Sequence, residues 1–212
     1  NSEFLSNKII KDFAKQANWL TLSSIYVQIF DFLDKYLIKI FLGSTSLAIY
    51  SIPQQISGKL SVLSDGLISV FIPRISSRKK IIDKKNIFNS NFYVFFYLIG
   101  LLLFLINPFL DRILSWWLGE SNNLKIIFLF KIFLIVSFYI CITHIISTFF
   151  DTEFKSKMNS QIETFVLIIF ILGMIISIYK SSLDFFAFTI LIRSIVSFFI
   201  KVIFAKKFIM NF

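Results

Sequence analysis

Long apolar runs, separated by short polar segments, make up almost the whole chain. A run of about 17 to 25 mainly apolar residues is enough for a helix to cross the hydrocarbon core of a bilayer. Six runs reach that length, so the pattern predicts an all-α polytopic membrane protein whose six-helix bundle fills residues 17–207. The expected spans are 17–42, 47–75, 92–110, 124–150, 162–179 and 185–205. Their short connections leave no room for a soluble domain.

The two ends of the chain differ from these spans. Residues 1–16 place Lys on one helical side and apolar residues on the other, which is typical of an amphipathic helix on a membrane surface. We expect either a cytoplasmic linker helix or a continuation of the first span, and a short cytoplasmic tail at 208–212. The first residue is Asn1, and no basic region with a cleavage site follows, so we expect the chain to begin within a longer protein.

The first two spans carry polar side chains at steps of three and four, so each row lies on one helix face. The rows are Thr21, Ser24, Gln28, Asp31, Lys35 and Lys39, then Ser51, Gln54, Gly58, Ser61, Asp65 and Ser69. Small polar residues alone are typical of contacts between membrane helices. Ionisable side chains at membrane depth usually face protein or a water-filled cavity. We therefore favour a cavity, and with it a transport function, for rows that include Asp31, Lys35 and Asp65.

Composition supports a membrane protein. Hydrophobic residues make up 57% of the chain, charged residues 16%, and the mean hydropathy is +0.80, which is too apolar for a soluble domain of this length. The net charge of +10 does not indicate nucleic acid binding, because the basic residues fall in short clusters between the spans. One Cys and one His exclude an internal disulfide and make a Cys/His metal site implausible. We expect no cofactor.

Orientation follows from the uneven distribution of Lys and Arg, which gather in the cytoplasmic loops of membrane proteins. One side receives Lys8, Lys11, Lys15, Arg74, Arg78, Lys79, Lys80, Lys84, Lys85, Lys155, Lys157, Lys201, Lys206 and Lys207. The other side receives only Arg112, Lys125 and Lys180. The pattern predicts that both ends of this chain lie in the cytoplasm.

Five basic residues remain at membrane depth: Lys35, Lys39, Lys59, Lys131 and Arg193. Each needs a partner, a route to the interface or an anionic cargo, because an isolated charge in the bilayer is costly. Lys39 and Lys131 lie near helix ends and can reach the interface, whereas Lys35 can pair with Asp31 one turn away.

Arg193 lies close to the middle of its span and is the leading candidate for a cargo or gating contact. Glu163 is its expected ion-pair partner, although the predicted boundaries place Glu163 roughly 10 Å nearer the cytoplasmic edge. The pair therefore requires the fifth span to begin earlier than predicted. His144 has no carboxylate placed beside it by the sequence, so we assign it to packing or hydrogen bonding rather than to proton transfer.

The segment from Asn18 to Ser76 resembles a known family. Its order W-L-T, L-D-K-Y-L-I, F-L-G, A-I-Y-S-I-P-Q-Q-I, K-L and F-I-P-R-I-S is similar to the seventh and eighth helices of the polysaccharide transporter family, the Wzx-type O-antigen flippases of the MATE-like superfamily. The segment I-L-S-W-W-L-G-E, from Ile113 to Glu120, resembles the turn between helices nine and ten of that family. The resemblance covers nearly all of this chain and the C-terminal half of a typical member.

This resemblance implies one half of a MATE-like bundle in the bacterial inner membrane. It implies a flippase that moves an undecaprenyl-diphosphate-linked oligosaccharide, an O-antigen or capsule repeat unit, by alternating access. Expected partners are this cargo, membrane lipids, a polysaccharide polymerase and a chain-length regulator. The cavity candidates are Arg193, Lys35, Lys59, Gln28 and Gln54, since Lys and Arg suit phosphate. The ion-coupling candidates are Asp31, Asp34 and Asp65.

Two other functions fit parts of the pattern. A multidrug or toxin antiporter of the same superfamily would need a cavity rich in acidic residues, but basic residues at membrane depth equal or outnumber the acidic ones here. A membrane enzyme such as an O-antigen polymerase would need a large extracytoplasmic loop with catalytic residues. The longest such loop expected here, about 111–123, holds no His, Cys or Ser constellation. We therefore expect a transporter and not an enzyme.

Overall fold

The computed structural model describes residues 7–77, 81–118, 124–153 and 155–210, and every element assigned in these ranges is helical. Parts of the expected features lie outside them: residues 1–6 of the amphipathic segment, residues 78–80 of the basic loop, the turn residues 119–123, and 211–212 of the tail. The expected all-α architecture is confirmed for the described residues.

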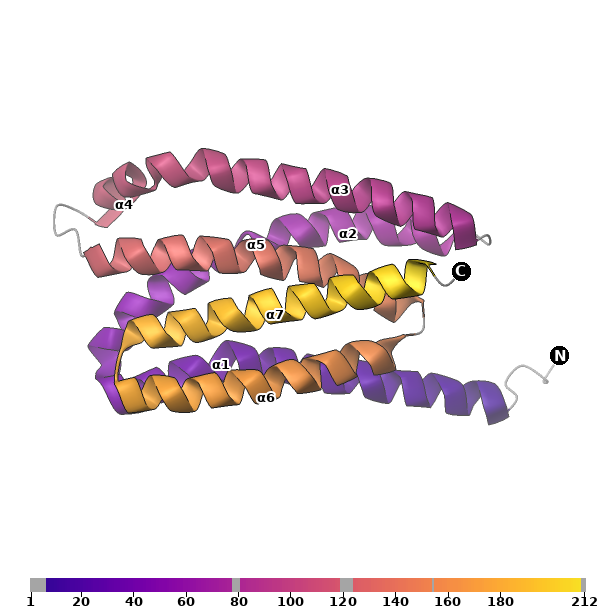
Figure 1. Ribbon diagram of the computed structural model, residues 1–212, viewed down its shortest axis with the longest axis horizontal. Helices are drawn as coiled ribbons and strands as arrows, with labels where there is room; N and C mark the ends of the chain where they lie inside the picture. The colour runs from indigo at the N-terminus through magenta and orange to yellow at the C-terminus, as the bar shows by residue number, and fades with distance from the viewer. Residues whose placement is uncertain (1–6, 78–80, 119–123, 154, 211–212) are drawn as a thin grey trace.

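The first helix, α1 (Asn7–Gly58), changes direction at Gly43 (Figure 1). It runs without a break from Asn7 through residue 17, so the amphipathic segment and the first span are continuous. Gly43 has φ 83° and ψ 173°, a backbone region that is accessible almost only to glycine. The second arm contains the buried Pro53, which cannot donate a backbone hydrogen bond within the helix.

A second interruption separates α1 from α2 (Ser61–Ser76). The backbone N–H groups of Lys59 and Leu60 donate to the carbonyls of Ile56 and Ser57, both at 3.1 Å. These are the tighter three-residue bonds of a 3₁₀ turn, which break the regular α-helical hydrogen bonding. The α1 and α2 helices thus form one long helical run with a sharp turn at Gly43 and a break after Gly58.

The next part of the chain covers the outside of the bundle. The α3 helix (Ile81–Ile106) leads through the 3₁₀ turn η1 (Asn107–Phe109), which contains Pro108, into the short helix α4 (Leu110–Leu118). Leu110 and Leu114 of α4 pack against Phe130 and Leu134 of α5. On α3, Phe104 is 76% exposed, as expected for a helix whose outer face meets lipid.

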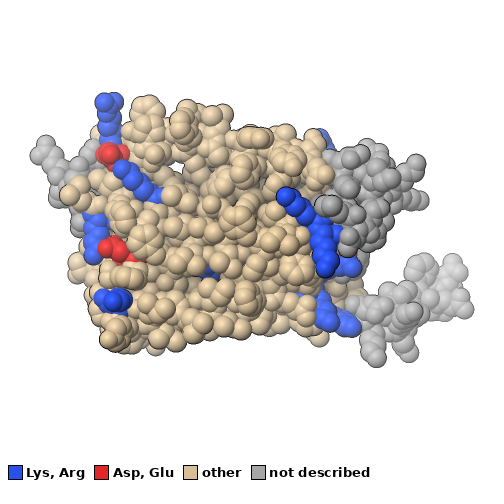
Figure 2. Space-filling view, viewed as in Figure 1, with Lys and Arg blue, Asp and Glu red and all other residues tan. Residues whose placement is uncertain are grey.

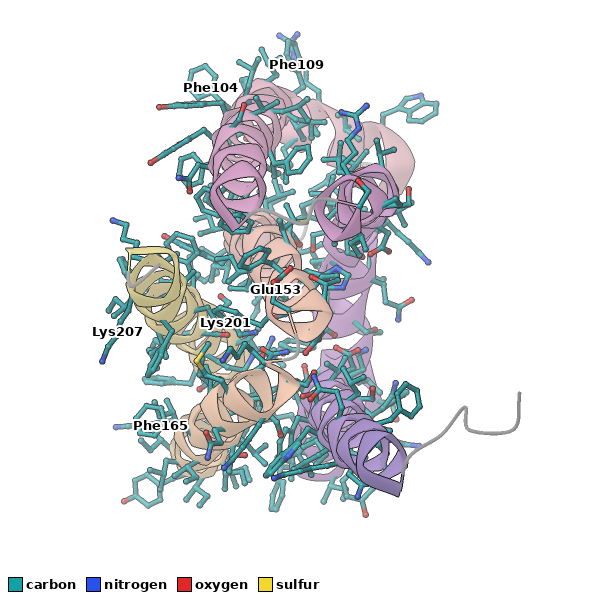
Figure 3. The ribbon with its side chains drawn as sticks, turned by 90° about the vertical axis from the view of Figure 1, so that its right-hand side faces the viewer. Phe104, Phe109, Glu153, Phe165, Lys201 and Lys207 are labelled. Carbon is teal, nitrogen blue, oxygen red and sulfur yellow. The ribbon has the colours of Figure 1, made fainter. Side chains whose placement is uncertain are left out.

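Three long helices complete the bundle: α5 (Leu124–Thr152), α6 (Ser156–Lys180) and α7 (Leu183–Met210). The α5 helix is central and contacts α1, α2, α3, α6 and α7. Figure 3 shows it between α2 and α3 on one side and α1, α6 and α7 on the other. Its apolar sequence is typical of a membrane-spanning helix, and many of its side chains are buried by these neighbours.

Close backbone packing joins α6 to α7. A Cβ added at Gly173 would collide with the side chain of Thr189, so only glycine fits the observed spacing. One turn later, the hydroxyls of Ser177 and Thr189 are hydrogen bonded at 3.0 Å. Small and hydroxyl-bearing residues at such contacts are typical of membrane helix pairs. The α6 helix ends at Lys180, and the φ of 49° at the following Ser181 turns the chain toward α7.

Five helical segments of the described chain are long and apolar enough to cross a membrane: Phe13–Arg74, Phe88–Leu114, Leu124–Thr152, Ser156–Lys180 and Leu183–Lys207. The first has 62 residues and includes both the Gly43 turn and the break after Gly58. It takes the place of the first two predicted spans, 17–42 and 47–75. The other four contain or closely match the remaining predicted spans.

Charge separates along the length of the molecule. Figure 2 shows Lys and Arg near both ends of the long axis and acidic residues near the left end, with a broad band almost free of charge between the two ends on that face. The α1 helix begins, and α7 ends, at the same end of the molecule (Figure 1). This arrangement is what a bundle that spans a membrane requires.

Candidate functional site

A buried carboxylate joins the two arms of α1 across the Gly43 turn. Asp34 is fully buried, and its Oδ2 accepts hydrogen bonds from Tyr50 Oη at 2.7 Å and Gln54 Nε2 at 2.9 Å. Its Oδ1 accepts a 2.7 Å bond from the backbone N–H of Lys35. Tyr50 is also fully buried. Since a buried charge must be compensated by hydrogen bonds or an opposite charge, these contacts are what allow Asp34 to lie inside the bundle.

Arg193 of α7 brings a positive charge to this carboxylate cluster. Its guanidinium carbon lies 4.3 Å from the ring centroid of Phe30 and 5.7 Å from that of Phe170, so the cation is held against two aromatic faces. It interacts electrostatically with Glu163, Asp34 and Asp31. The Arg193 Nε is buried and has no hydrogen-bond partner in the structure. Arg193 and Asp34 thus lie in one interior polar region between α1, α6 and α7.

A second interior cluster lies closer to the end where α1 begins. Lys201 of α7 forms an ion pair with Glu163 of α6 and donates a 2.6 Å hydrogen bond to Ser147 of α5. The side chains of Lys201 and Glu163 are only 3% and 13% exposed. In Figure 3, Lys201 points into the bundle, whereas Lys207 on the same helix points away from it.

This cluster differs from the sequence-based expectation in two ways. Glu163 pairs with Lys201, and the expected ion pair between Glu163 and Arg193 is not formed, although all three residues are described. Lys201 was also expected among the cytoplasmic surface lysines, but it is buried. Lys201 follows Arg193 by eight residues, or about 12 Å of helix. That displacement accounts for the depth mismatch that the sequence implied between Glu163 and Arg193.

Further polar contacts extend this cluster toward the helix ends. Gln16 Nε2 of α1 donates to Ser156 Oγ of α6 at 2.8 Å. Asn159 of α6 lies 3.4 Å from both carboxylate oxygens of Asp151. Asp151 also interacts electrostatically with Lys201. Polar contacts therefore continue from the Lys201 and Glu163 cluster to the ends of α5 and α6.

The break between α1 and α2 is held by one face of α5. Ser137 Oγ donates to the carbonyl of Ser57 at 2.9 Å, and Cys141 Sγ to the carbonyl of Leu60 at 3.6 Å. One turn later, His144 Nδ1 lies 3.2 Å from Asp65 Oδ1. The carbonyls of Ser57 and Leu60 also accept backbone bonds from Leu60 and Leu63, so the α5 side chains supply a second donor to each.

The remaining candidates lie nearer the surface. Gln28, Asp31 and Lys59 are exposed in the structure, and Lys35 is half-buried. The Lys35 ammonium lies 5.9 Å from the ring centroid of Phe32, and none of the described ion pairs joins it to Asp31. Lys131, expected to reach the interface, lies 3.5 Å from Asp111. The structure therefore brings Asp34, Gln54 and Arg193 into one region, and leaves Gln28 and Lys59 outside it.

Sequence reasoning missed Tyr50, Ser147 and the partner role of Lys201. Lys201 shares a helical face with Arg193 at a spacing of eight residues, which was the available signal. Tyr50 gave no signal, since tyrosine is common near membrane interfaces. In the described residues, no group of three or more His, Cys, Asp or Glu side chains is arranged to hold a metal ion.

Comparisons with known proteins agree with the resemblance in the sequence. Residues 1–79 match a family model described as "Polysaccharide biosynthesis protein". A protein of Shigella flexneri described as "Putative O-antigen transporter" is 22% identical over 144 residues, which cover 68% of this chain and 34% of that relative. The chain therefore spans only about a third of the length of this relative. No solved structure matches the chain.

Proposed function

We propose that this chain, a member of the polysaccharide transporter family, forms half of a flippase for an undecaprenyl-diphosphate-linked oligosaccharide, the O-antigen or capsule repeat unit. The observation that carries the proposal is the polar interior of an otherwise apolar bundle. Asp34, Glu163, Arg193 and Lys201 are charged side chains inside segments that can span a membrane. Intramembrane ionisable residues are costly and usually belong to a transport path.

The 62-residue segment Phe13–Arg74 supports a count of six crossings in place of five. As a straight helix it would be about 93 Å long, roughly three times the thickness of the hydrocarbon core. The turn at Gly43 divides it into two lengths, each suited to one crossing, at 17–42 and 47–75. With six crossings, both ends of the described chain lie on one side, which we assign to the cytoplasm from the distribution of Lys and Arg.

The cargo cavity that we propose lies on the polar faces of α1 and α2. Gln28 and Lys59 are exposed and available to a ligand, and Lys35 is half-exposed. An exposed ammonium suits the diphosphate of the cargo. The break after Gly58 supports this position, because interrupted helices commonly form the binding sites of transporters. In this proposal the polyprenyl tail stays in lipid, and alternating access moves the α1 and α2 faces relative to a second half.

Gln54 and Arg193 have a different role in this proposal. Both lie in the interior cluster around Asp34, so they hold the two arms of α1 against α7 rather than first meeting the cargo. Asp31 and Asp65 are exposed and available to a coupling ion, while Asp34 would bind one only after its hydrogen bonds to Tyr50 and Gln54 open. A polysaccharide polymerase and a chain-length regulator in the bacterial inner membrane would use the exported unit.

The experiment is complementation. The complete gene is expressed in a strain that lacks its own flippase, and surface polysaccharide is separated on a gel. We expect the wild type to restore polymer, and Lys59→Gln to reduce polymer more than Lys39→Gln, a matched change of an exposed lysine at the far end of the first span. Loss of polymer with free repeat units already at the outer face would instead identify a polymerase and refute the proposal.

A further inference from the structure

The function proposed above assigns Asp65 of α2 to a coupling ion, but it does not use the contact between Asp65 and His144 of α5. Its Nδ1 to Oδ1 distance is 3.2 Å, and the side chains are 47% and 57% exposed. Both residues lie inside helical segments that can span a membrane. The sequence contains a single histidine, so this is the one imidazole in the chain. A histidine–carboxylate contact that is exposed on the surface of this chain at membrane depth is unusual, because most intramembrane ionisable groups are covered by protein.

The pair lies next to the break between α1 and α2, so a change in the pair can alter how α2 is held there. It is the third contact in a stripe along α5, after Ser137 and Cys141, which hold the carbonyls of Ser57 and Leu60. These three α5 residues lie at successive turns of one face and fix the chain on both sides of the break. The first two contacts are neutral hydrogen bonds. Only the third, at the exposed end of the stripe, changes its charge when a proton is gained or lost.

Charged groups surround the imidazole on several sides. Asp65 comes from α2, Asp151 from α5 itself and Lys201 from α7, and all three interact electrostatically with His144. Cys141, one turn away on α5, also interacts electrostatically with Asp65. Glu163 of α6 is already paired with Lys201. Two carboxylates and one ammonium therefore act on a group that titrates near neutral pH in water.

We propose that His144 and Asp65 form a proton-binding site that couples protonation to the attachment of α2 to α5. This inference rests on the proposed transport function and names the proton as a coupling ion. When the imidazole is protonated, the imidazolium donates a charge-assisted hydrogen bond to the Asp65 carboxylate. When one proton leaves the ring for water, the neutral ring can still donate through Nδ1, but the attraction between opposite charges is lost. The α2 helix is then freer to move about the break after Gly58.

The direct test is the titration of His144 in the complete protein, labelled with ¹³C-histidine. Its signal is identified as the one missing from His144→Gln. We expect Asp65→Asn to raise the proton dissociation constant at least threefold, because the opposite charge that favours imidazolium is removed. An unchanged midpoint in Asp65→Asn would overturn the inference. The titration midpoint of His144 is measured without any transport assay, and the Asp65→Asn variant retains the imidazole that is being titrated.

The coupling is tested by hydrogen exchange of α2 peptides at about pH 6 and about pH 8, on either side of the ordinary imidazole pKa, after correction for the intrinsic rate. We expect wild-type α2 to be less protected at the higher pH and His144→Gln to show no such difference. Ser137→Ala, a neutral member of the same stripe, is the matched control and should lower protection equally at both values. Wild-type pH dependence in His144→Gln, or none in the wild type, would contradict the coupling.

Export assays separate this inference from the proposed function. If the complete wild-type protein fails to restore polymer while His144 titrates as described, the transport proposal fails and the proton site stands. If export is restored and the pH dependence of export is the same in the wild type and Asp65→Asn, the inference fails and the transport proposal stands.

Discussion

The buried pair of Lys201 and Glu163 allows the sharpest test of the interior. Its two side chains are 3% and 13% exposed and come from different helices, with Ser147 of a third helix bonded to the ammonium. Removal of one partner from a buried ion pair leaves an uncompensated charge and typically costs about 3 to 5 kcal/mol. We therefore expect Lys201→Met and Glu163→Gln each to reduce the free energy of unfolding by about 3 kcal/mol or more.

The double variant, Lys201→Met with Glu163→Gln, tests whether the two residues are paired directly. With both charges removed, no unpaired ion remains, so the double change should cost clearly less than the sum of the two single changes. Denaturant unfolding of the purified protein in detergent measures all three variants. A double-variant cost equal to the sum of the single costs would refute the direct pairing of these residues.

Arg193→Met serves as the matched control for partner choice. In the structure, Arg193 acts on Glu163 only through its electrostatic field, and no ion pair joins them. Coupling between Glu163→Gln and Arg193→Met should therefore be weaker than coupling between Glu163→Gln and Lys201→Met. Stronger coupling of Glu163 to Arg193 than to Lys201 would support the pair expected from the sequence and contradict the pair in the structure.

Three further predictions concern the backbone and the Asp34 cluster. Gly43→Ala should lower the free energy of unfolding by about 1 to 3 kcal/mol, because alanine is strained at φ 83°, and thermal unfolding with Ala48→Gly as control measures the change. Tyr50→Phe removes one buried hydrogen bond to Asp34 at little change in volume, and should cost about 1 to 3 kcal/mol in the same assay; no loss would mean that water replaces the hydroxyl. Gly173→Ala should separate α6 from α7 and lower the yield of folded protein, measured by size-exclusion chromatography, and normal yield would show that the close contact is not required.

The helices were largely predictable because apolar length is a strong signal. The predicted spans 124–150, 162–179 and 185–205 fall inside α5, α6 and α7. The Gly43 turn was also expected, since the first span was predicted to end at residue 42. The break after Gly58 was not predicted, because a Gly-Lys-Leu sequence differs little from ordinary helix. Its contacts with Ser137 and Cys141 involve residues that lie about 80 positions away in the chain.

The candidate site was predictable in part. Helical spacing identified the face that carries Gln54, and Asp34 and Arg193 were named as candidates, but the sequence could not specify which helices would face one another. Partner choice depends on the axial shift between helices, and a shift of about 12 Å exchanges Arg193 for Lys201 opposite Glu163. The contact between His144 and Asp65 was missed for the same reason, since no rule of spacing joins the polar row that contains Asp65 to a residue on another helix.

The central claim, that the protein moves a lipid-linked oligosaccharide across the inner membrane, is tested most directly by the sidedness of the undecaprenyl-linked unit. Cells that lack their own flippase and polymerase receive the complete gene, and the unit is assayed by its accessibility to an impermeant enzyme added outside. We predict that the unit becomes accessible with the wild type and stays inside with an empty vector. Equal accessibility in both strains would contradict the account.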